Sequence, residues 1–464
     1  MKKVLAIDLG ATSGRGVVGY IENDMLKTEE VLRFSHKIID EKNRNRWQFN
    51  KILNEIEKTI IKYNDISSVG VDTWGVDIGL LDSKGELLEN PISYRDLHNE
   101  KAFKKYLEVH DSFSLFEKTG NQLLPINTYF QLYSLYLYNK NIIEDIDKIL
   151  FMPDLISYFL SGEMTLEETI LSTSGFYDLD KKVINKQLLN EIGFDVNLFA
   201  KKITAGKTVG STKKSKLIKL RDYDIDVVSV CGHDTASALL VTNSFNNPLT
   251  AFLSCGTWSL VGVTASKPIR NYKAFENNIS NELGFNSTNM FFKNITGLYL
   301  IEKLIDELEA KNNERYTYDD INKKISNRNN YKRIINVEDE IFSRNDTKIL
   351  EFLNNEFGQL DDYLYFEIIY DSLVLKYKET LDQISKITNT KIDKLHVIGG
   401  GAKSSYLMQK IADKLHIDVL AGPYEATIYG NILIQLLNRG EIRDLKEGLD
   451  LIKKSVEYKY YKWR

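Results

Sequence analysis

Two stretches of this chain, one in each half, repeat the pattern of a strand, a tip rich in glycine and hydroxyl side chains, and a second strand. The first covers residues 4–20 with its tip at 9–14, and the second covers residues 249–263 with its tip at 254–259. Apolar runs joined by a short glycine-containing segment are typical of β-hairpins. Because one such hairpin stands in each half, the repeat predicts two duplicated domains. A ligand is then expected in a cleft between them.

Helix and strand patterns alternate along the rest of the chain, which places it in the α/β class. A chain of 464 residues exceeds what one hydrophobic core usually supports and favours two domains of roughly 200 residues each. Apolar residues that fall on one helical face predict two helices, and a strand follows each of them, at 66–71 and at 395–398. The apolar face of the first helix contains Ile52, Leu53, Ile56, Ile60 and Ile61. The apolar face of the second contains Ile368, Ile369, Leu373, Leu381 and Ile384. Residues 311–348, rich in Asn, Lys and Asp, predict a solvated helical excursion.

Charge and composition exclude several partners. A net charge of -4 with interspersed acidic and basic residues gives no electrostatic footprint for nucleic acid or for a membrane surface. We expect Cys231 and Cys255 to be reduced core residues, because no second thiol or histidine stands at metal-ligand spacing. No apolar run approaches the length of a signal peptide or membrane span, so we expect a cytoplasmic protein. The oligomeric state stays open.

Residues 231–238 place Asp234 in a turn lined by small residues, between a strand (227–231) and a helix (235–241). A carboxylate so placed, beside the imidazole of His233, can accept the proton of a substrate hydroxyl. The alternative is that Asp234 only caps the helix N-terminus. These eight residues do not decide between the two interpretations.

Three tips rich in glycine and hydroxyl groups, at 10–14, 254–259 and 399–405, favour nucleotide binding. Their backbone amides can point at phosphate oxygens, although a tight turn explains any single one of them. None matches the Walker A or Gly-x-Gly-x-x-Gly pattern, and Gly206-Lys207-Thr208 lacks the first P-loop glycine. Asp8 ends a strand beside the first tip, and this position suits a carboxylate that holds a magnesium-bound water. The alternative is that Asp8 only initiates the turn.

A further cluster at residues 71–77 combines Asp72, Trp74 and Asp77 around Gly75. Carboxylates that accept from hydroxyls, beside an aromatic face, suit a polyhydroxylated ligand. The same cluster is equally consistent with a hairpin edge.

Taken in chain order, these segments resemble the FGGY carbohydrate kinases, within the superfamily of sugar kinases and actin-like ATPases. The most specific matches are His233-Asp234-Thr235-Ala236-Ser237-Ala238, Gly256-Thr257-Trp258-Ser259-Leu260 and Asn294-Ile295-x-Gly297-Leu298. The resemblance implies two RNase H-like domains, at residues 1–240 and 241–464, around a central cleft. It also implies transfer of the γ-phosphoryl group of ATP, with Mg²⁺, to O1 of L-rhamnulose.

The resemblance also assigns roles to individual residues. Asp234 is the implied proton acceptor, and the implied sugar contacts are His233, Thr235, Gly75 and Asn294, beside the Asp72 and Trp74 proposed above. The implied phosphate and nucleotide contacts are Ala11, Thr12, Ser13, Gly14, Arg15, Thr257, Glu302 and Gly400. Thr12 stands where Ser is commoner in the family, and Glu302 stands where Gln is expected to contact ATP. A carboxylate there would repel a polyphosphate unless a metal bridges the two.

Two other functions are compatible with the sequence. One is a kinase for another ketose or deoxy sugar such as L-fuculose or D-xylulose, because residues outside the motifs decide the sugar. The other is a non-catalytic sugar or nucleotide sensor on the same scaffold. The presence of both Asp8 and Asp234 argues against a sensor.

Overall fold

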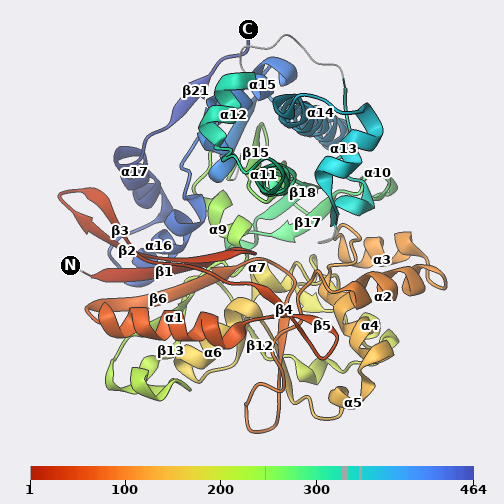
Figure 1. Cartoon of the computed structure of the whole chain (residues 1–464). Helices are drawn as coiled ribbons and strands as arrows, with labels where there is room; N and C mark the ends of the chain where they lie inside the picture. The colour runs from red at the N-terminus through yellow and green to blue at the C-terminus, as the bar shows by residue number, and fades with distance from the viewer. Residues whose placement is uncertain (1, 246, 326–332, 344–346) are drawn as a thin grey trace. The chain divides into compact units, whose positions relative to one another are not determined.

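The computed structural model describes residues 2–245, 247–325, 333–343 and 347–464, which form two compact units (Figure 1). The first unit comprises Met1–Val241, Ala265–Met290 and Thr427–Val456, and the second comprises Thr242–Thr264, Phe291–Ala426 and Glu457–Arg464. The division differs from a single boundary after residue 240, because two later segments return to the first unit and pack there. Each of these segments carries part of the candidate site.

A six-stranded mixed sheet organises the first unit in the order β13-β14-β6-β1-β2-β3. Its strands are β1 (Lys3–Leu9), β2 (Ser13–Glu22), β3 (Met25–Ser35), β6 (Ile66–Thr73), β13 (Lys207–Ser211) and β14 (Asp226–Ser229). The predicted N-terminal hairpin is confirmed as the antiparallel pair β1–β2, while β6 runs parallel to both β1 and β14. Val4 to Ile7 are fully buried, as expected for a central strand covered on both faces.

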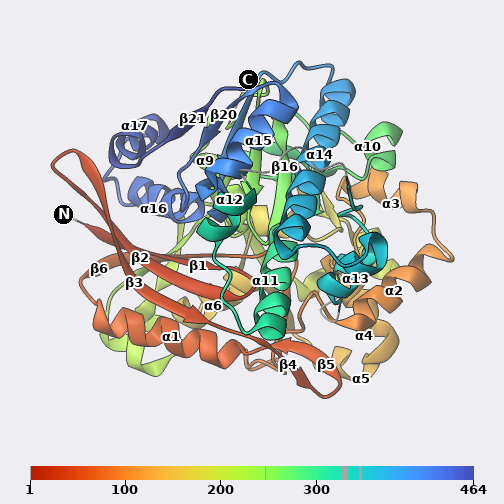
Figure 2. The ribbon, with the colours of Figure 1, turned by 45° about the horizontal axis from the view of Figure 1, so that its top comes forward.

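Helices cover both faces of this sheet, with α1 (Phe49–Lys62) and α16 (Ala426–Asn438) on opposite sides (Figures 1 and 2). The predicted inner face of α1 is confirmed for Ile52, Leu53, Ile56 and Ile60, which are buried. On the other side, α16 lies so close that a Cβ on Gly70 would come within 2.9 Å of the Asn431 side chain. The absence of a side chain at Gly70 therefore permits this helix to reach the sheet.

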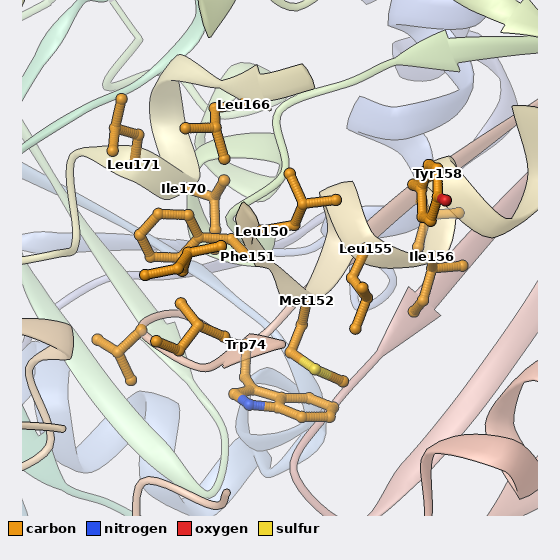
Figure 3. Close-up of a cluster of buried hydrophobic side chains, with 14 of the residues drawn as sticks. Trp74, Leu150, Phe151, Met152, Leu155, Ile156, Tyr158, Leu166, Ile170 and Leu171 are labelled. Carbon is orange, nitrogen blue, oxygen red and sulfur yellow. The ribbon is translucent and has the colours of Figure 1, made fainter. Parts of the chain in front are cut away.

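Between β6 and β14 the first unit carries a long run of short elements. It includes β7 (Ile78–Leu81), α2 (Leu97–Leu107), α3 (Ser112–Thr119), α4 (Thr128–Tyr138), β8 (Lys148–Phe151), α6 (Met152–Ser161), β9 (Thr165–Glu167) and α7 (Glu168–Leu171). Figure 3 shows side chains of β8, α6, β9 and α7 gathered with Trp74 in one buried apolar cluster. This core supports the segment that follows β6.

The second unit repeats the central strand order of the first. Its sheet contains β18-β16-β15-β19-β20-β21 in that order, with β15–β16 antiparallel and β15–β19 and β19–β20 parallel. The bounds are β15 (Thr250–Cys255), β16 (Trp258–Ala265), β18 (Asn289–Thr296), β19 (Lys394–Ile398), β20 (Asp418–Ala421) and β21 (Lys459–Tyr461). In both units the order is third, second, first, fourth and fifth strand, which confirms the predicted duplication.

The helices of the second unit include α11 (Tyr299–Asn312), α12 (Tyr318–Ile325), α14 (Asp362–Thr388) and α15 (Ser405–Leu415). The five residues predicted for the inner face of α14 are all buried. Of the predicted excursion at 311–348, residues 326–332 and 344–346 lie outside the described residues. The described part is not wholly solvated, because α12 buries Ile321 and Ile325.

Cys231 and Cys255 are both free and buried, as predicted. Across the part of the chain that the structure describes, every helix is too short or too polar to cross a membrane. The C-terminal aromatic segment forms β21, an edge strand that pairs with β20.

Candidate active site

Three strands of the first unit end side by side and bring the predicted site segments together. Asp8 on β1 is in register with Asp72 on β6 and with Arg15 on β2. The Thr73 N–H donates to the Gly232 carbonyl at 2.9 Å, which places the Asp234 segment beside the end of β6. The carboxyl ends of parallel strands are the usual ligand-binding edge of an α/β sheet.

Asp234 begins helix α9 (Asp234–Leu240), whose N-cap residue is His233. Its Oδ1 accepts the Thr235 N–H at 2.5 Å and the Thr235 hydroxyl at 3.2 Å. The capping alternative is not what the structure shows, because Asp234 lies inside the first turn with 31% of its side chain exposed. Burial raises the pKa of Asp234, the Asp8 charge raises it further, and His233 opposes both. An accessible carboxylate with raised proton affinity suits a general base.

The imidazole of His233 lies between two carboxylates. Its Nε2 is 3.4 Å from Asp234 Oδ1, and its Nδ1 is 3.2 Å from Oε2 of Glu282 on β17 (Ser280–Leu283). Burial alone would lower the pKa of His233, but Glu282, Asp234 and Glu167 outweigh it and raise the pKa above its ordinary value. A cation is therefore favoured next to the candidate base.

Glu167, at the end of β9, anchors the backbone that carries Asp234. Its Oε2 accepts the N–H of Gly232 at 2.9 Å and also the N–H of Thr169 at 2.9 Å. The His233 N–H donates to the Thr169 hydroxyl at 3.3 Å. Since these bonds hold two successive residues before Asp234, they fix where α9 begins.

Arg15 and Asp8 form an ion pair, with Arg15 Nη2 2.8 Å from Asp8 Oδ2. Magnesium usually keeps several waters and takes only one or two protein carboxylates, with substrate phosphates completing its shell. Among the described residues, no group of three or more His, Cys, Asp or Glu side chains is placed to hold a metal ion. A single carboxylate such as Asp8 is compatible with an ion held mainly through water and phosphates, and its role at a metal stays a prediction.

Asp72 and Trp74 are buried side chains, and their predicted role as sugar contacts stays a prediction. Asp72 has no exposed surface, and its Oδ2 accepts from Asn431 Nδ2 on α16 at 2.5 Å. Burial, together with the Asp8 charge, raises the pKa of Asp72 well above its usual value. The Trp74 indole is 6% exposed and donates to Asp77 at 2.9 Å. Both buried side chains pack in the interior at the end of β6.

Gly75 remains partly exposed at the end of this segment. The next residue, Val76, has a φ of 70°, which a β-branched residue rarely adopts. Two threonines hold it there, because Thr128 donates to the Val76 carbonyl at 2.6 Å and the Val76 N–H donates to Thr173 at 3.1 Å. Such local strain is typical of functional sites, and here it sets the direction of the backbone at Gly75.

The first tip is shorter than predicted, because Leu9 still belongs to β1, and Ser13 and Gly14 already belong to β2. Thr12 is exposed, and Gly10, Ala11 and Ser13 are partly exposed. Gly14 is glycine for a packing reason: a Cβ there would lie 2.4 Å from the Phe34 ring. The open part of the tip is therefore 10–13, with the Arg15 side chain beside it.

In the second unit, the predicted nucleotide residues surround the β15–β16 tip. The carbonyls of Gly256 and Thr257 accept the N–H groups of Leu298 at 2.9 Å and Gly297 at 3.1 Å, which seats the start of α11 on this tip. The turn after β19 packs there too, since a Cβ on Gly401 would lie 2.3 Å from Cys255 Sγ.

Four predicted contacts belong to these elements: Thr257, Asn294, Glu302 and Gly400. A Cβ on Gly400 would meet no atom within 4 Å, so a ligand can approach its backbone. Glu302 is exposed in the first turn of α11, and its charge adds to burial in raising the pKa of Tyr318. The carboxylate thus lies near a phenol of α12.

Both halves of the chain match one protein family. Residues 3–241 match the N-terminal domain, and residues 251–438 the C-terminal domain, of the FGGY family of carbohydrate kinases. This chain belongs to that family. The FGGY kinase is therefore an enzyme that transfers a phosphoryl group to a carbohydrate.

Relatives of this FGGY kinase extend over its whole length. It is 33% identical to a rhamnulokinase of Ligilactobacillus salivarius, covering 99% of this chain and 95% of the relative. It is 31% identical to a rhamnulokinase of Bacillus subtilis, covering 98% of this chain and 94% of the relative. Among solved structures, a xylulose kinase from Lactobacillus acidophilus gives a TM-score of 0.81 at 15% identity, covering 100% of this chain and 94% of that one. A Plasmodium falciparum glycerol kinase with ADP gives 0.77 at 15% identity, covering 100% and 95%. These structures share the fold.

Several residues of the site were not foreseen from the sequence. Glu167, Thr169 and Glu282 come from short elements with no motif, and Asn431 comes from a helix much later in the chain. An isolated carboxylate carries no local signal for its partner. Glu167 takes the N-cap position of α7, but Glu is not among the residues that usually mark a helix start, so the sequence carried no signal for it.

Replacing Glu167 with Gln is expected to weaken the pH dependence of stability. Burial raises the pKa of Glu167 from its ordinary 4.5 to about 7, so the folded state holds this proton more tightly than the unfolded state. Its contribution to the free energy of unfolding is therefore full below pH 4.5 and is lost as the pH rises through about 7. Urea unfolding of both proteins between these limits should show a shallower decline for Glu167→Gln; parallel declines would contradict the raised pKa.

Proposed function

We propose that this FGGY kinase is a rhamnulokinase, which transfers the γ-phosphoryl group of ATP to O1 of L-rhamnulose and releases L-rhamnulose 1-phosphate and ADP. The observation that carries the proposal is the match to rhamnulokinases over 98% or more of the chain. The accessible carboxylate of Asp234 beside His233 supports it chemically. A role in L-rhamnose breakdown follows from the reaction.

Asp234 is the general base of the proposed mechanism. As the sugar O1 attacks the γ-phosphorus, its proton passes to Asp234, and the bond to the β-phosphate oxygen breaks. Phosphoryl transfer asks little covalent chemistry of the protein, so one base and correct positioning are enough. The bonds from Glu167 to the Gly232 backbone keep the base in place before the sugar arrives.

Binding of the two substrates is divided among the predicted residues. The exposed backbone at Gly75, with His233, Thr235 and Asn294, is assigned to the sugar hydroxyls. The first tip from Ala11 to Ser13 and the Arg15 side chain are assigned to the phosphates, and Thr257, Glu302 and Gly400 to the rest of the nucleotide. Asp8 would hold Mg²⁺ through water, and the ion would neutralise phosphate charge when bound.

Two other functions remain as alternatives to a rhamnulokinase: a kinase for a different sugar, and a protein without catalytic activity. A kinase for L-fuculose or D-xylulose would use the same base, since the fold is shared with a xylulose kinase of 15% identity. A non-catalytic sensor would bind ATP or sugar without turnover. The raised proton affinity of Asp234 favours a catalytic carboxylate over a sensor.

The test measures ADP release with purified protein, Mg-ATP and each of L-rhamnulose, L-fuculose, D-xylulose and glycerol. We expect kcat/KM for L-rhamnulose to exceed that for every other sugar by about tenfold or more, because a site that hydrogen-bonds each hydroxyl penalises a misplaced one. A higher value for another sugar would keep the mechanism and change the substrate. ATP binding without turnover on any sugar would favour the sensor.

A further inference from the structure

Glu282 lies next to the candidate base although it comes from a distant part of the sequence. The residue is 6% exposed, and its Oε2 faces His233 Nδ1 at 3.2 Å. Both atoms are buried, and among the described residues neither makes a hydrogen bond of good geometry, so a close ion-pair contact joins the two side chains. The family resemblance assigned no role to Glu282, and the rest of the proposed mechanism does not use it.

The position of Glu282 is fixed by the backbone on either side of it. The Asn281 N–H donates to the Gly120 carbonyl at 2.8 Å, and the Leu283 N–H donates to the Ser172 hydroxyl at 2.9 Å. Successive side chains of a strand point to opposite faces, so Glu282 and Ser280 share the face toward His233. Ser280 Oγ lies 3.4 Å from Oε1 of Glu282. Because the residues on both sides of Glu282 are hydrogen-bonded through their backbone, the strand holds this carboxylate next to the imidazole.

We propose that Glu282 is a positioning residue that holds His233 by Nδ1 and thereby turns Nε2 toward Asp234 and the sugar hydroxyl. The proposal rests on the proposed kinase function and names a further residue of the same site. A partner on one imidazole nitrogen sets which nitrogen carries a proton and how the ring is oriented. With the Glu282 carboxylate beside Nδ1, the protonated imidazole presents the N–H of Nε2 to the acceptors in front of it.

The charges around His233 give Glu282 a second effect. His233 faces Glu282, Asp234 and Glu167, while Asp234 faces His233 and Asp8. The charges of Asp8 and Asp234 also raise the pKa of the buried Asp72, and the charge of Arg15 lowers it. Removing the Glu282 charge would make the His233 cation less favourable. Asp234 would then lose a neighbouring charge that stabilises its ionised form, and its pKa would rise.

The experiment compares Glu282→Gln with the wild type on the sugar that the wild type phosphorylates best. We expect kcat to fall about tenfold and the acidic limb of the kcat profile to move up by about one pH unit, with KM for ATP within about twofold of wild type. A purely structural role would not move the acidic limb. An unchanged kcat and pH profile in a folded Glu282→Gln protein would overturn the proposal.

Glu168→Gln is the matched control, because it also removes a buried carboxylate of the same unit. Glu168 accepts from Tyr177 at 2.8 Å, Lys202 at 2.9 Å and Ser287 at 2.9 Å. Its hydrogen bonds among the described residues therefore lead away from His233. We expect its acidic limb to match that of the wild type. A shift as large as that of Glu282→Gln would overturn the specific role of Glu282.

Two further measurements keep the proposal testable on its own. A pH titration of the imidazole ¹⁵N signals, with His233 assigned by its loss in His233→Asn, should show His233 losing its second proton at a higher pH in the wild type than in Glu282→Gln; identical titrations would overturn the proposal. If Glu282→Gln does not fold, Glu282→Asp should keep the acidic limb while lowering kcat. Failure of the wild type on L-rhamnulose would concern only the proposed substrate, since the spectrum requires no turnover.

Discussion

Replacing Asp234 with Asn is expected to lower kcat by about three orders of magnitude while leaving the affinity for ATP nearly unchanged. A positioned general base contributes roughly 10²–10⁴-fold to the rate, and Asn keeps the shape of Asp but cannot take up the proton. The Thr235 N–H can still donate to the amide oxygen at this position, so the start of α9 is retained. Steady-state ADP release gives kcat, and titration calorimetry gives the ATP dissociation constant.

Asp226→Asn serves as the control for Asp234→Asn. Asp226 opens β14, the strand that leads to the site, and forms an ion pair with Arg439. Its charge is removed from the same unit without touching the candidate base, so kcat should stay within about twofold of wild type. A near-native kcat for Asp234→Asn would remove this residue from the base role. Parallel loss of ATP binding would point to structural damage instead.

The fold could be predicted because its main signals are local. Each hairpin shows as two apolar runs with a glycine-rich tip between them, and the repeat of that pattern in both halves indicates the duplication. The inner face of α14 follows from helical periodicity in the same way. The return of residues 265–290 and 427–456 to the first unit could not be predicted, because it depends on which surfaces meet after the chain has left and come back.

The candidate site was predicted where a motif marks it and missed where a partner is remote. Asp234 and His233 stand out within eight residues, and the parallel pairing of β1 with β6 explains why Asp8 lies with them. The burial of the side chains in the candidate site could not be predicted from the sequence. Trp74 has an aromatic face of the kind that packs against sugars. In the structure its indole N–H and that of Trp47 both donate to the buried Asp77, so both rings lie in the protein interior. Sequence alone does not show which face of a strand end is covered.

Replacing Gly430 with Ala is expected to destabilise the first unit by about 3 kcal/mol and to lower kcat, because it would push α16 away from α9. A Cβ on Gly430 would lie 1.9 Å from the Ser237 carbonyl oxygen, so the two helices touch backbone to backbone. Backbone atoms cannot move aside as a side-chain tip can, and overpacking of this kind typically costs about 1–3 kcal/mol or more. The gain of about 1 kcal/mol in helix propensity from Gly to Ala does not offset it. Urea unfolding and kcat, measured on the same preparation, report the two effects.

Gly448→Ala tests whether the effect comes from this backbone contact or from any added methyl group on a helix of the first unit. In α17 (Leu445–Ser455), the atoms nearest to a Cβ on Gly448 would be the side-chain tips of Leu433 and Ile442, at 2.8 and 2.9 Å. Flexible side-chain ends can shift, so its cost should stay below about 1 kcal/mol and kcat should not change. Equal stability of Gly430→Ala and wild type would show that α9 can move freely. Because Asp234 is the first residue of α9, loss of rate in Gly430→Ala beyond its loss of stability would mean that α16 holds the base in position.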